Sequence, residues 1–445
     1  MDSIIIEGGT QLKGEIKISG AKNAVLPLIA AALLTDETVI LKNVPKLSDI
    51  DSLITLLRTL GADVERYENH SNFKKISNNQ NDLVDDFCDG TDTLYISAKN
   101  ITNFEASYDL VRKMRASVLV LGPLLARFKK AKVSLPGGCA IGVRPIDFHI
   151  SGLQKLNAQI FLEDGYINAS SKGQLIGNEI DFPKISVTGT ENILMAAVLA
   201  KGETKILNAA AEPEIVDLCN MLISMGAKIK GHGTNEITVT GVNSLHGTTH
   251  VVISDRIELG TYILSTAITK GNVTMRGKNI SILAKPLIGI YHKIGLNIQI
   301  LNDHSLNASM EGNSLHGITV ETAPHPGFPT DLQAQLMAAM TVADSESYIK
   351  ENIWENRFMH VPELTRMGAD IKLLGNVAQI KPVTSLNGAP VTATDLRASF
   401  SLVMAGLVAK GTTLIRRVYH LDRGYEKVEE KLSNCGAKIK RLKND

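Results

Sequence analysis

The sequence lacks the features of a membrane-spanning or nucleic-acid-binding protein. Its 445 residues carry a formal net charge of +1, so no excess of basic side chains is present to attract a nucleic acid or a membrane surface. The longest apolar runs, such as Val25–Leu34, are about half of the ~20 residues that a membrane span requires. No basic segment typical of an export signal precedes them. We therefore expect the protein to bind neither a nucleic acid nor a membrane. Any site for an anion must be built by a few converging side chains.

Cysteine is also scarce, and its distribution argues against disulfides and metal sites. The four thiols are far apart, with no C-x-x-C pair and no zinc-ligand spacing to a histidine: Cys88, Cys139, Cys219 and Cys435. Cys219 stands on an apolar helix face and Cys435 at a helix end, which is typical of small buried hydrophobic residues. No cofactor-binding loop is visible. The sequence therefore predicts a protein of the reducing cytoplasm that uses no metal and no cofactor.

What the chain does contain is a weak internal repeat. An amphipathic helix ends in a short motif, usually Gly-Ala, and a β-rich run follows it. The motif recurs six times, centred on Gly61, Asn157, Gly226, Gly295, Gly368 and Gly436. Four of the five intervals are 68 to 73 residues long, and the first interval is 96. A polar stretch at about 69–92 lengthens it, and we expect this stretch to be a flexible surface insertion.

Each copy also contains an earlier helix that is apolar on nearly every side. Examples are Val25–Leu34, Asn192–Ala200 and Ser401–Ala409. A helix without a polar face must be buried, so each unit is expected to place one helix inside and one outside. A chain of this length should form two domains. We therefore predict an α/β (α+β) fold with three units per domain, pseudo-threefold symmetry, outer sheets and buried helices, and a ligand cleft between the halves.

Polar residues recur at the start of the buried helices. They are Lys22, Asn23, Arg115, Asp331, Asp395 and Arg397. The start of a helix carries free N–H groups and a partial positive charge. Lysine and arginine gain nothing from that dipole, so their recurrence suggests a bound anion. Two other interpretations stay open: each carboxylate caps its helix, or each cation is simply a solvated side chain.

Polar residues also recur at a second place in the repeat unit, the loop between the strand and the outer helix. It contains Cys139, Arg144, Asp147, Glu212, Glu214, Glu351–Arg357 and His420–Glu426. The glycines of Gly137–Gly142 let the backbone approach a ligand closely, and Arg144 offers a forked cation for a carboxylate or phosphate. A structural role stays open as the alternative for three of these features. In that interpretation Cys139 is a structural thiol, the charges of Glu351, Glu355 and Arg357 form an ion-pair network, and Trp354 belongs to the core.

Six ordered motifs carry a family resemblance. They are Ser19–Ala24, Leu135–Gly142 with Arg144 and Pro145, Pro324–Asp331, Glu351–Phe358, Ala393–Ser399 and Tyr419–Glu426. They resemble the enolpyruvyl transferases, and among these the UDP-N-acetylglucosamine 1-carboxyvinyltransferases that begin bacterial peptidoglycan synthesis. The resemblance implies two inside-out α/β prism domains, at 22–253 and at 1–21 plus 254–445. It also implies transfer of the enolpyruvyl group of phosphoenolpyruvate to the 3-hydroxyl of UDP-N-acetylglucosamine, with release of phosphate, by addition and elimination.

The resemblance also implies roles for individual residues. Asp331 resembles the carboxylate that removes the hydroxyl proton. Cys139 resembles the thiol that protonates the methylene carbon, forms an adduct with phosphoenolpyruvate and reacts with epoxides such as fosfomycin. The residues implied for phosphoenolpyruvate are Lys22, Asn23, Arg115, Arg144, Arg397 and Arg423, and Lys22 and Arg397 are implied in catalysis as well. Those implied for the nucleotide sugar are Asn23, Arg115, Arg144, Pro145, Ile146, Asp147, Phe148, Lys184, Ser186, Val187, Asp331 and Ile353. Thr188 departs from the pattern, since some members have glycine there.

Two other functions stay open from the sequence. The sister enzyme that makes enolpyruvylshikimate phosphate uses the same donor and architecture, but it lacks a cysteine loop like Leu135–Arg144. A non-catalytic paralogue that binds a nucleotide sugar would be expected to have lost Cys139, Asp331 or one of the arginines, and none of them is missing.

Overall fold

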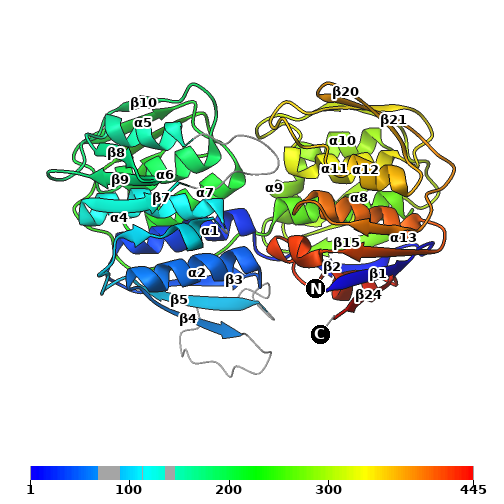
Figure 1. Cartoon of the computed structure of the whole chain (residues 1–445), viewed down its shortest axis with the longest axis horizontal. Coiled ribbons are helices and arrows are strands. Elements are labelled where there is room, and N and C mark those ends of the chain that lie inside the picture. Colours follow the sequence, from blue (N-terminus) through cyan, green and yellow to red (C-terminus); the bar gives the residue numbers. More distant parts are fainter. Residues whose placement is uncertain (1, 69–90, 113, 136–145, 444–445) are drawn as a thin grey trace. The chain divides into compact units, whose positions relative to one another are not determined.

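The structure is a computed structural model that describes residues 2–68, 91–112, 114–135 and 146–443, with only the backbone of Arg115. The described chain packs into two compact units (Figure 1). The C-terminal unit comprises residues 2–19 and 254–443, and the N-terminal unit comprises the described residues from 20 to 253. Cys88, Cys139, Arg144 and Pro145 lie outside the described residues, as does most of the polar stretch expected at about 69–92. The end of that stretch was wrongly predicted, because Asp92 is buried and begins a strand.

Within the described residues, each unit forms three four-stranded sheets of one common topology. In every sheet one edge strand pairs in parallel with its neighbour, and the other pairings are antiparallel. Along each central strand, alternate side chains are buried, as in β1 (Ser3–Glu7), where Ile4 and Ile6 are fully buried. One face of each sheet therefore covers the interior of its unit.

The three sheets of the N-terminal unit are β14(Thr249–Val251)-β3(Val39–Val44)-β5(Asp92–Ser97)-β4(Asp63–Glu68), β6(Glu105–Ala106)-β7(Lys130–Ser134)-β9(Tyr166–Ser170)-β8(Gln159–Glu163) and β10(Glu179–Asp181)-β11(Glu203–Leu207)-β13(Glu236–Thr240)-β12(Lys228–Lys230). Those of the C-terminal unit are β22(Pro390–Thr392)-β23(Thr412–Arg416)-β1-β24(Lys438–Leu442), β16(Asn297–Asn302)-β17(Ser305–Ser309)-β15(Asn272–Arg276)-β2(Lys13–Lys17) and β18(Thr319–Glu321)-β19(Ser347–Lys350)-β21(Val377–Lys381)-β20(Asp370–Leu374).

Three helices pack together in the middle of each unit. In the N-terminal unit they are α1 (Lys22–Ala31), α4 (Leu121–Phe128) and α6 (Val187–Ala197). In the C-terminal unit they are α8 (Arg256–Ile268), α11 (Gln333–Met340) and α13 (Ala398–Val408). Every residue of α11 is buried, including Gln333 and Gln335, as expected for a helix without a charged face. Buried hydroxyls bond to the helix backbone itself: Ser265 Oγ donates to the Thr261 carbonyl at 2.8 Å. The predicted buried helices and outer sheets are confirmed.

The remaining helices are shorter or lie on the outer side. They are η1 (Ala32–Leu34), α2 (Ser48–Leu60), α3 (Tyr108–Val111), η3 (Arg115–Val120), α5 (Asp147–Lys155), α7 (Pro213–Ser224), α9 (Ile280–Ala284), η4 (Lys285–Leu287), α10 (Ile288–Lys293), η5 (Thr330–Leu332), α12 (Val361–Arg366), η6 (Val418–Arg423) and α14 (Val428–Asn434). The repeat motif follows six of them, namely α2, α5, α7, α10, α12 and α14. Its central residue has positive φ in all six copies: five are glycines, such as Gly61 at 104°, and the sixth is Asn157 at 70°. The central residue of the motif thus has the left-handed backbone conformation that ends a helix.

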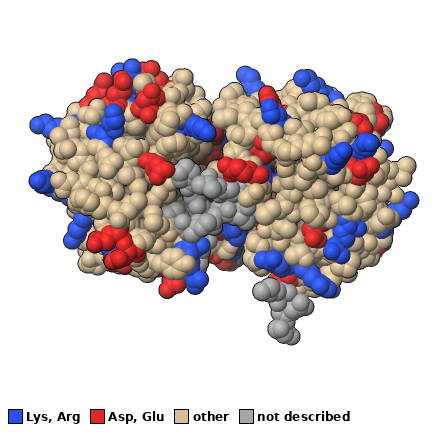
Figure 2. Space-filling model, turned by 45° about the horizontal axis from the view of Figure 1, so that its top comes forward, with Lys and Arg blue, Asp and Glu red and all other residues tan. Residues whose placement is uncertain are grey.

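The surface carries both signs of charge. On the face shown in Figure 2, basic and acidic side chains are interspersed over the described residues. Among the described residues, no helix is both long and apolar enough to cross a membrane.

Candidate active site

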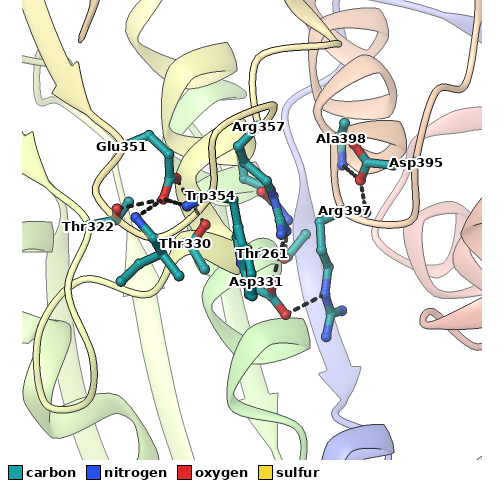
Figure 3. Close-up of polar contacts among 12 residues, drawn as sticks. Thr261, Thr322, Thr330, Asp331, Glu351, Trp354, Arg357, Asp395, Arg397 and Ala398 are labelled. Atoms are coloured by element: carbon teal, nitrogen blue, oxygen red, sulfur yellow. Dashed lines mark hydrogen bonds and ion pairs between the residues drawn. The ribbon is translucent and has the colours of Figure 1, made fainter. Parts of the chain in front are cut away.

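The predicted base Asp331 lies in η5 of the C-terminal unit and binds two arginines (Figure 3). Arg357 Nη2 donates to Oδ1 at 2.8 Å, and Arg397 Nε donates to Oδ2 at 3.2 Å. The Asp331 side chain is 26% exposed, whereas the arginine side chains are 4% and 2% exposed. Within the described residues, neither η5 nor the following helix at 333–340 has a side-chain cap at its start. It is a reachable carboxylate held by two buried cations.

Arg397 has donors that the described protein does not use. Its terminal nitrogens Nη1 and Nη2 are buried and have no hydrogen-bond partner among the described residues. Burial works against the charged guanidinium, but Tyr425 and Asp331 outweigh it and raise the pKa of Arg397 above its usual value. An unpaired buried donor costs about 1–3 kcal/mol, and more when it is charged. An anion bound at these nitrogens would remove that cost.

Glu351 fixes the loop that carries Arg357. Its Oε1 accepts hydrogen bonds from Thr322 Oγ1 at 2.8 Å, from the Ile353 amide at 2.8 Å and from the Trp354 amide at 3.2 Å. Its Oε2 accepts from Thr330 Oγ1 at 2.9 Å, next to Asp331. Glu351 is therefore structural, but it binds hydroxyls and amides, and Arg357 pairs with Asp331. Among the described residues, Glu351, Glu355 and Arg357 do not form the ion-pair network that the sequence left open. Glu355 is exposed and Trp354 is only half-buried.

Arg357 is the site residue that the sequence reasoning missed. The sequence indicates Arg357 only as a member of a structural ion-pair network, although it lies in the same kind of loop as other candidate residues. Its signal was the motif Glu351–Phe358, which the resemblance had singled out as a whole. Arg357 and Asp331 are 26 residues apart in sequence, so only the fold shows that they are paired.

The other predicted residues of the C-terminal unit have different surroundings. Ile353 lies half-buried in the Glu351 loop, and Arg423 ends η6 and is also half-buried. Asp395 is a helix cap, since its Oδ1 accepts from the Arg397 amide at 2.8 Å and from the Ala398 amide at 3.0 Å at the start of α13. Of the two carboxylates, then, the cap interpretation holds for Asp395 only.

Lys22 starts α1 in the N-terminal unit and is buried, so it is not a solvated side chain. Its Nζ lies 3.2 Å from Asp49 Oδ2, and Asp49 is also buried. This carboxylate compensates a cation that the helix dipole disfavours. Asn23 follows it and is half-buried. Arg115 begins η3, and its side chain lies outside the described residues.

Six of the residues predicted to contact the nucleotide sugar come from two segments that the fold brings together. Ile146, Asp147 and Phe148 lie at the start of α5, which packs against α6. Phe148 stacks near Phe182, with ring centroids 6.2 Å apart. Lys184 is exposed, and Ser186 and Val187 stand at the start of α6, where Ser186 Oγ accepts from the Gly189 amide at 3.1 Å. Two helix N-termini thus supply free N–H groups of the kind that bind phosphates.

Thr188 occupies the position that departs from the family pattern. It is exposed, and its Oγ1 lies 3.3 Å from His149 Nε2. His149 Nδ1 is bonded in turn to Asn192 Nδ2 at 2.9 Å. The threonine therefore links the first turns of α5 and α6 through a buried histidine.

Comparison with known proteins agrees with this architecture. The family model for EPSP synthase (3-phosphoshikimate 1-carboxyvinyltransferase) matches residues 6–86 and 81–432. UDP-N-acetylglucosamine 1-carboxyvinyltransferases of Rickettsia peacockii and Rickettsia rickettsii are 52% identical over 442 residues, which is 99% of this chain and 100% of each relative.

Solved structures share the fold at lower identity. The enolpyruvyl transferase NikO from Streptomyces tendae has a TM-score of 0.85 at 22% identity, over 100% of this chain and 99% of that one. EPSP synthase from Acinetobacter baumannii has a TM-score of 0.71 at 20% identity, over 99% of this chain and 100% of that one. The predicted fold class and family resemblance are therefore confirmed, and the chain belongs to the UDP-N-acetylglucosamine 1-carboxyvinyltransferase family of enolpyruvyl transferases.

Proposed function

We propose that this chain transfers the enolpyruvyl group of phosphoenolpyruvate to the 3-hydroxyl of UDP-N-acetylglucosamine and releases phosphate. The observation that carries the proposal is Asp331, a reachable carboxylate next to a buried guanidinium whose two terminal nitrogens have no partner among the described residues. The carboxylate suits the removal of a hydroxyl proton. The guanidinium suits the phosphate or carboxylate of the donor substrate.

The chemistry proceeds in two balanced steps. In the addition, Asp331 takes the proton of the 3-hydroxyl, the hydroxyl oxygen bonds to C2 of phosphoenolpyruvate, and the methylene carbon takes a proton from the Cys139 thiol to become a methyl group. In the elimination, the methyl group returns a proton to the Cys139 thiolate, the double bond forms again, and phosphate leaves C2 with the proton that Asp331 held. Arg397, and by resemblance Lys22, Asn23, Arg115, Arg144 and Arg423, hold the charged groups of the donor through both steps.

Cys139 is proposed as the acid that protonates the methylene carbon. The same thiol would form the adduct with phosphoenolpyruvate and would be the target of epoxides such as fosfomycin. We propose Ile146, Asp147, Phe148, Lys184, Ser186, Val187 and Ile353, together with Pro145, as contacts of the nucleotide sugar. A cytoplasmic location and a role in peptidoglycan synthesis belong to the same proposal.

The decisive test compares two acceptors. The purified chain is incubated with phosphoenolpyruvate and either UDP-N-acetylglucosamine or shikimate 3-phosphate, and phosphate release is measured together with the mass of the product. We expect release, and an enolpyruvyl ether of the nucleotide sugar, with UDP-N-acetylglucosamine only. Release with shikimate 3-phosphate would assign the sister activity. Binding of the nucleotide sugar without release would assign a non-catalytic role.

A further inference from the structure

Tyr425 contacts Arg397 and is not among the catalytic groups named so far. The centre of the guanidinium lies 5.1 Å from the centroid of the Tyr425 ring, a cation–π contact. Both side chains are almost fully buried. The guanidinium therefore lies over the Tyr425 ring, while Asp331 accepts a hydrogen bond from Nε.

The Tyr425 hydroxyl is bonded to two of the three central helices of its unit. It lies 3.0 Å from Thr261 Oγ1 of α8, and it accepts a hydrogen bond from Gln335 Nε2 of α11 at 2.9 Å. Thr261 and Gln335 have no exposed surface. Since Arg397 directly precedes α13, Tyr425 connects the start of the third central helix to the other two.

Two further aromatic rings support the tyrosine. Phe400 of α13 packs on Tyr425 with ring centroids 4.6 Å apart, and Tyr262 of α8 packs on Phe400 at 5.6 Å with the rings at 89°. Each ring is buried. Aromatic rings have few rotatable bonds, so this group fixes the plane of the Tyr425 ring at little cost in conformational entropy.

We propose that Tyr425 is a positioning residue for phosphoenolpyruvate, because it fixes the plane and direction of the Arg397 guanidinium. Asp331 binds only Nε of the planar guanidinium, so the whole plane can still tilt about that hydrogen bond. The ring restricts this tilt, and the buried Nη1 and Nη2, which have no partner among the described residues, are then held in one orientation. The inference rests on the proposed function, in which Arg397 binds the donor substrate.

The test compares Tyr425→Leu with Tyr425→Phe by steady-state kinetics of phosphate release. Tyr425→Leu removes the aromatic face and is expected to raise the KM for phosphoenolpyruvate about tenfold, a typical loss for a desolvated cation–π contact. The KM for UDP-N-acetylglucosamine should stay within about twofold, because the nucleotide sugar does not depend on this contact. Tyr425→Phe keeps the ring and should largely restore the KM for phosphoenolpyruvate, even where the hydroxyl loss lowers Tm.

Tyr291→Leu is the matched control, since Tyr291 is another buried tyrosine of the same unit, in α10. It should lower Tm without changing the ratio of the two KM values. A double-mutant cycle adds a second readout: in an Arg397→Lys background, Tyr425→Leu should raise the KM for phosphoenolpyruvate by less than about twofold. If Tyr425→Leu does not fold, Tyr425→Met tests the same point, because it also removes the aromatic face while filling the space with a flexible side chain, and the expected rise is again about tenfold.

An unchanged KM for phosphoenolpyruvate in folded Tyr425→Leu would overturn the inference. So would equal changes in both KM values, which would indicate a general loss of structure. These outcomes differ from a failure of the proposed function, in which the wild-type chain itself releases no phosphate with UDP-N-acetylglucosamine. In that case the inference falls together with the function on which it rests.

Discussion

Lys22 Nζ and Asp49 Oδ2 lie 3.2 Å apart in an ion pair of which both members are buried. The pair stands at the first turn of α1, where the helix dipole disfavours a cation. Asp49 is therefore the structural reason that a lysine can be held at this position. Because the two side chains form a pair, replacing both of them can separate the effect of Lys22 on stability from its effect on activity.

Replacing Lys22 alone should impair both stability and activity. In Lys22→Met the buried Asp49 loses this cation, and removal of one partner of a buried pair typically costs about 3–5 kcal/mol. In the double variant Lys22→Met with Asp49→Asn, urea unfolding should show most of this stability regained, while phosphate release stays very low. Full activity in the double variant would mean that Lys22 is only structural.

Asp331→Asn should abolish most of the turnover and also lower the stability, because the buried Arg357 and Arg397 lose the carboxylate that they share. The amide keeps the size of the side chain and still accepts a hydrogen bond, but it cannot take a proton from the acceptor hydroxyl. Loss of a general base typically lowers kcat by about 10²–10⁴-fold. Asp344→Asn is the control, because Asp344 is an exposed carboxylate bonded to His316. If Asp331→Asn and Asp344→Asn had equal kcat values, Asp331 would not be the base.

Cys139 should be the residue that carries the covalent adduct. Burial raises the pKa of Cys219 to about 12 and that of Cys435 to about 11, so these two thiols are expected to be unreactive at neutral pH. Intact-mass analysis with both substrates, followed by peptide mapping, should place the adduct on Cys139. Cys139→Ser should abolish or severely impair turnover, whereas Cys139→Asp retains an acid and some activity. Equal loss in the two folded variants would speak against a proton-donating role.

His360 should make the protein less stable as the pH falls. Burial lowers its pKa to about 4, and Arg357 adds to the effect while Asp395 opposes it. Between the ordinary value near 6.5 and about 4, the unfolded chain binds a proton that the folded chain does not. Stability is therefore lost progressively over this range, by roughly 3 kcal/mol for this group.

The measurement is urea unfolding of the wild type and His360→Met between pH 7 and pH 4. Neither ring nitrogen of His360 has a hydrogen-bond partner among the described residues, so an apolar side chain of similar length is a suitable replacement. The variant should lose less stability on acidification. His292→Gln, at an exposed histidine, should behave as the wild type. Parallel curves for wild type and His360→Met would contradict a buried neutral imidazole.

Much of the fold could be predicted because its signals are local. A helix without a polar face has to be buried, and this applies to α6, α11 and α13 wherever they pack. The glycine of the repeat motif marks the left-handed end of a helix, and Asn157 shows that asparagine can serve there. Which side chains pair in the candidate active site depends instead on contacts between residues that are far apart in the sequence. Nothing near Arg357 in the sequence indicates that it binds Asp331, or that Glu351 fixes the loop between them.

Asp331 and Asp395 stand in the same tripeptide, Thr-Asp-Leu, at the start of two equivalent helices. The sequence alone determined that both carboxylates lie at the start of a buried helix of their repeat unit. Local sequence patterns are enough to indicate where a helix starts and whether it is buried. Only the tertiary structure decided their roles. Asp395 turns back to cap α13, whereas Asp331 meets two buried arginines from loops that are 26 and 66 residues away. The physical reason is that a cap needs only its own helix, while an ion pair needs a partner that the fold must deliver.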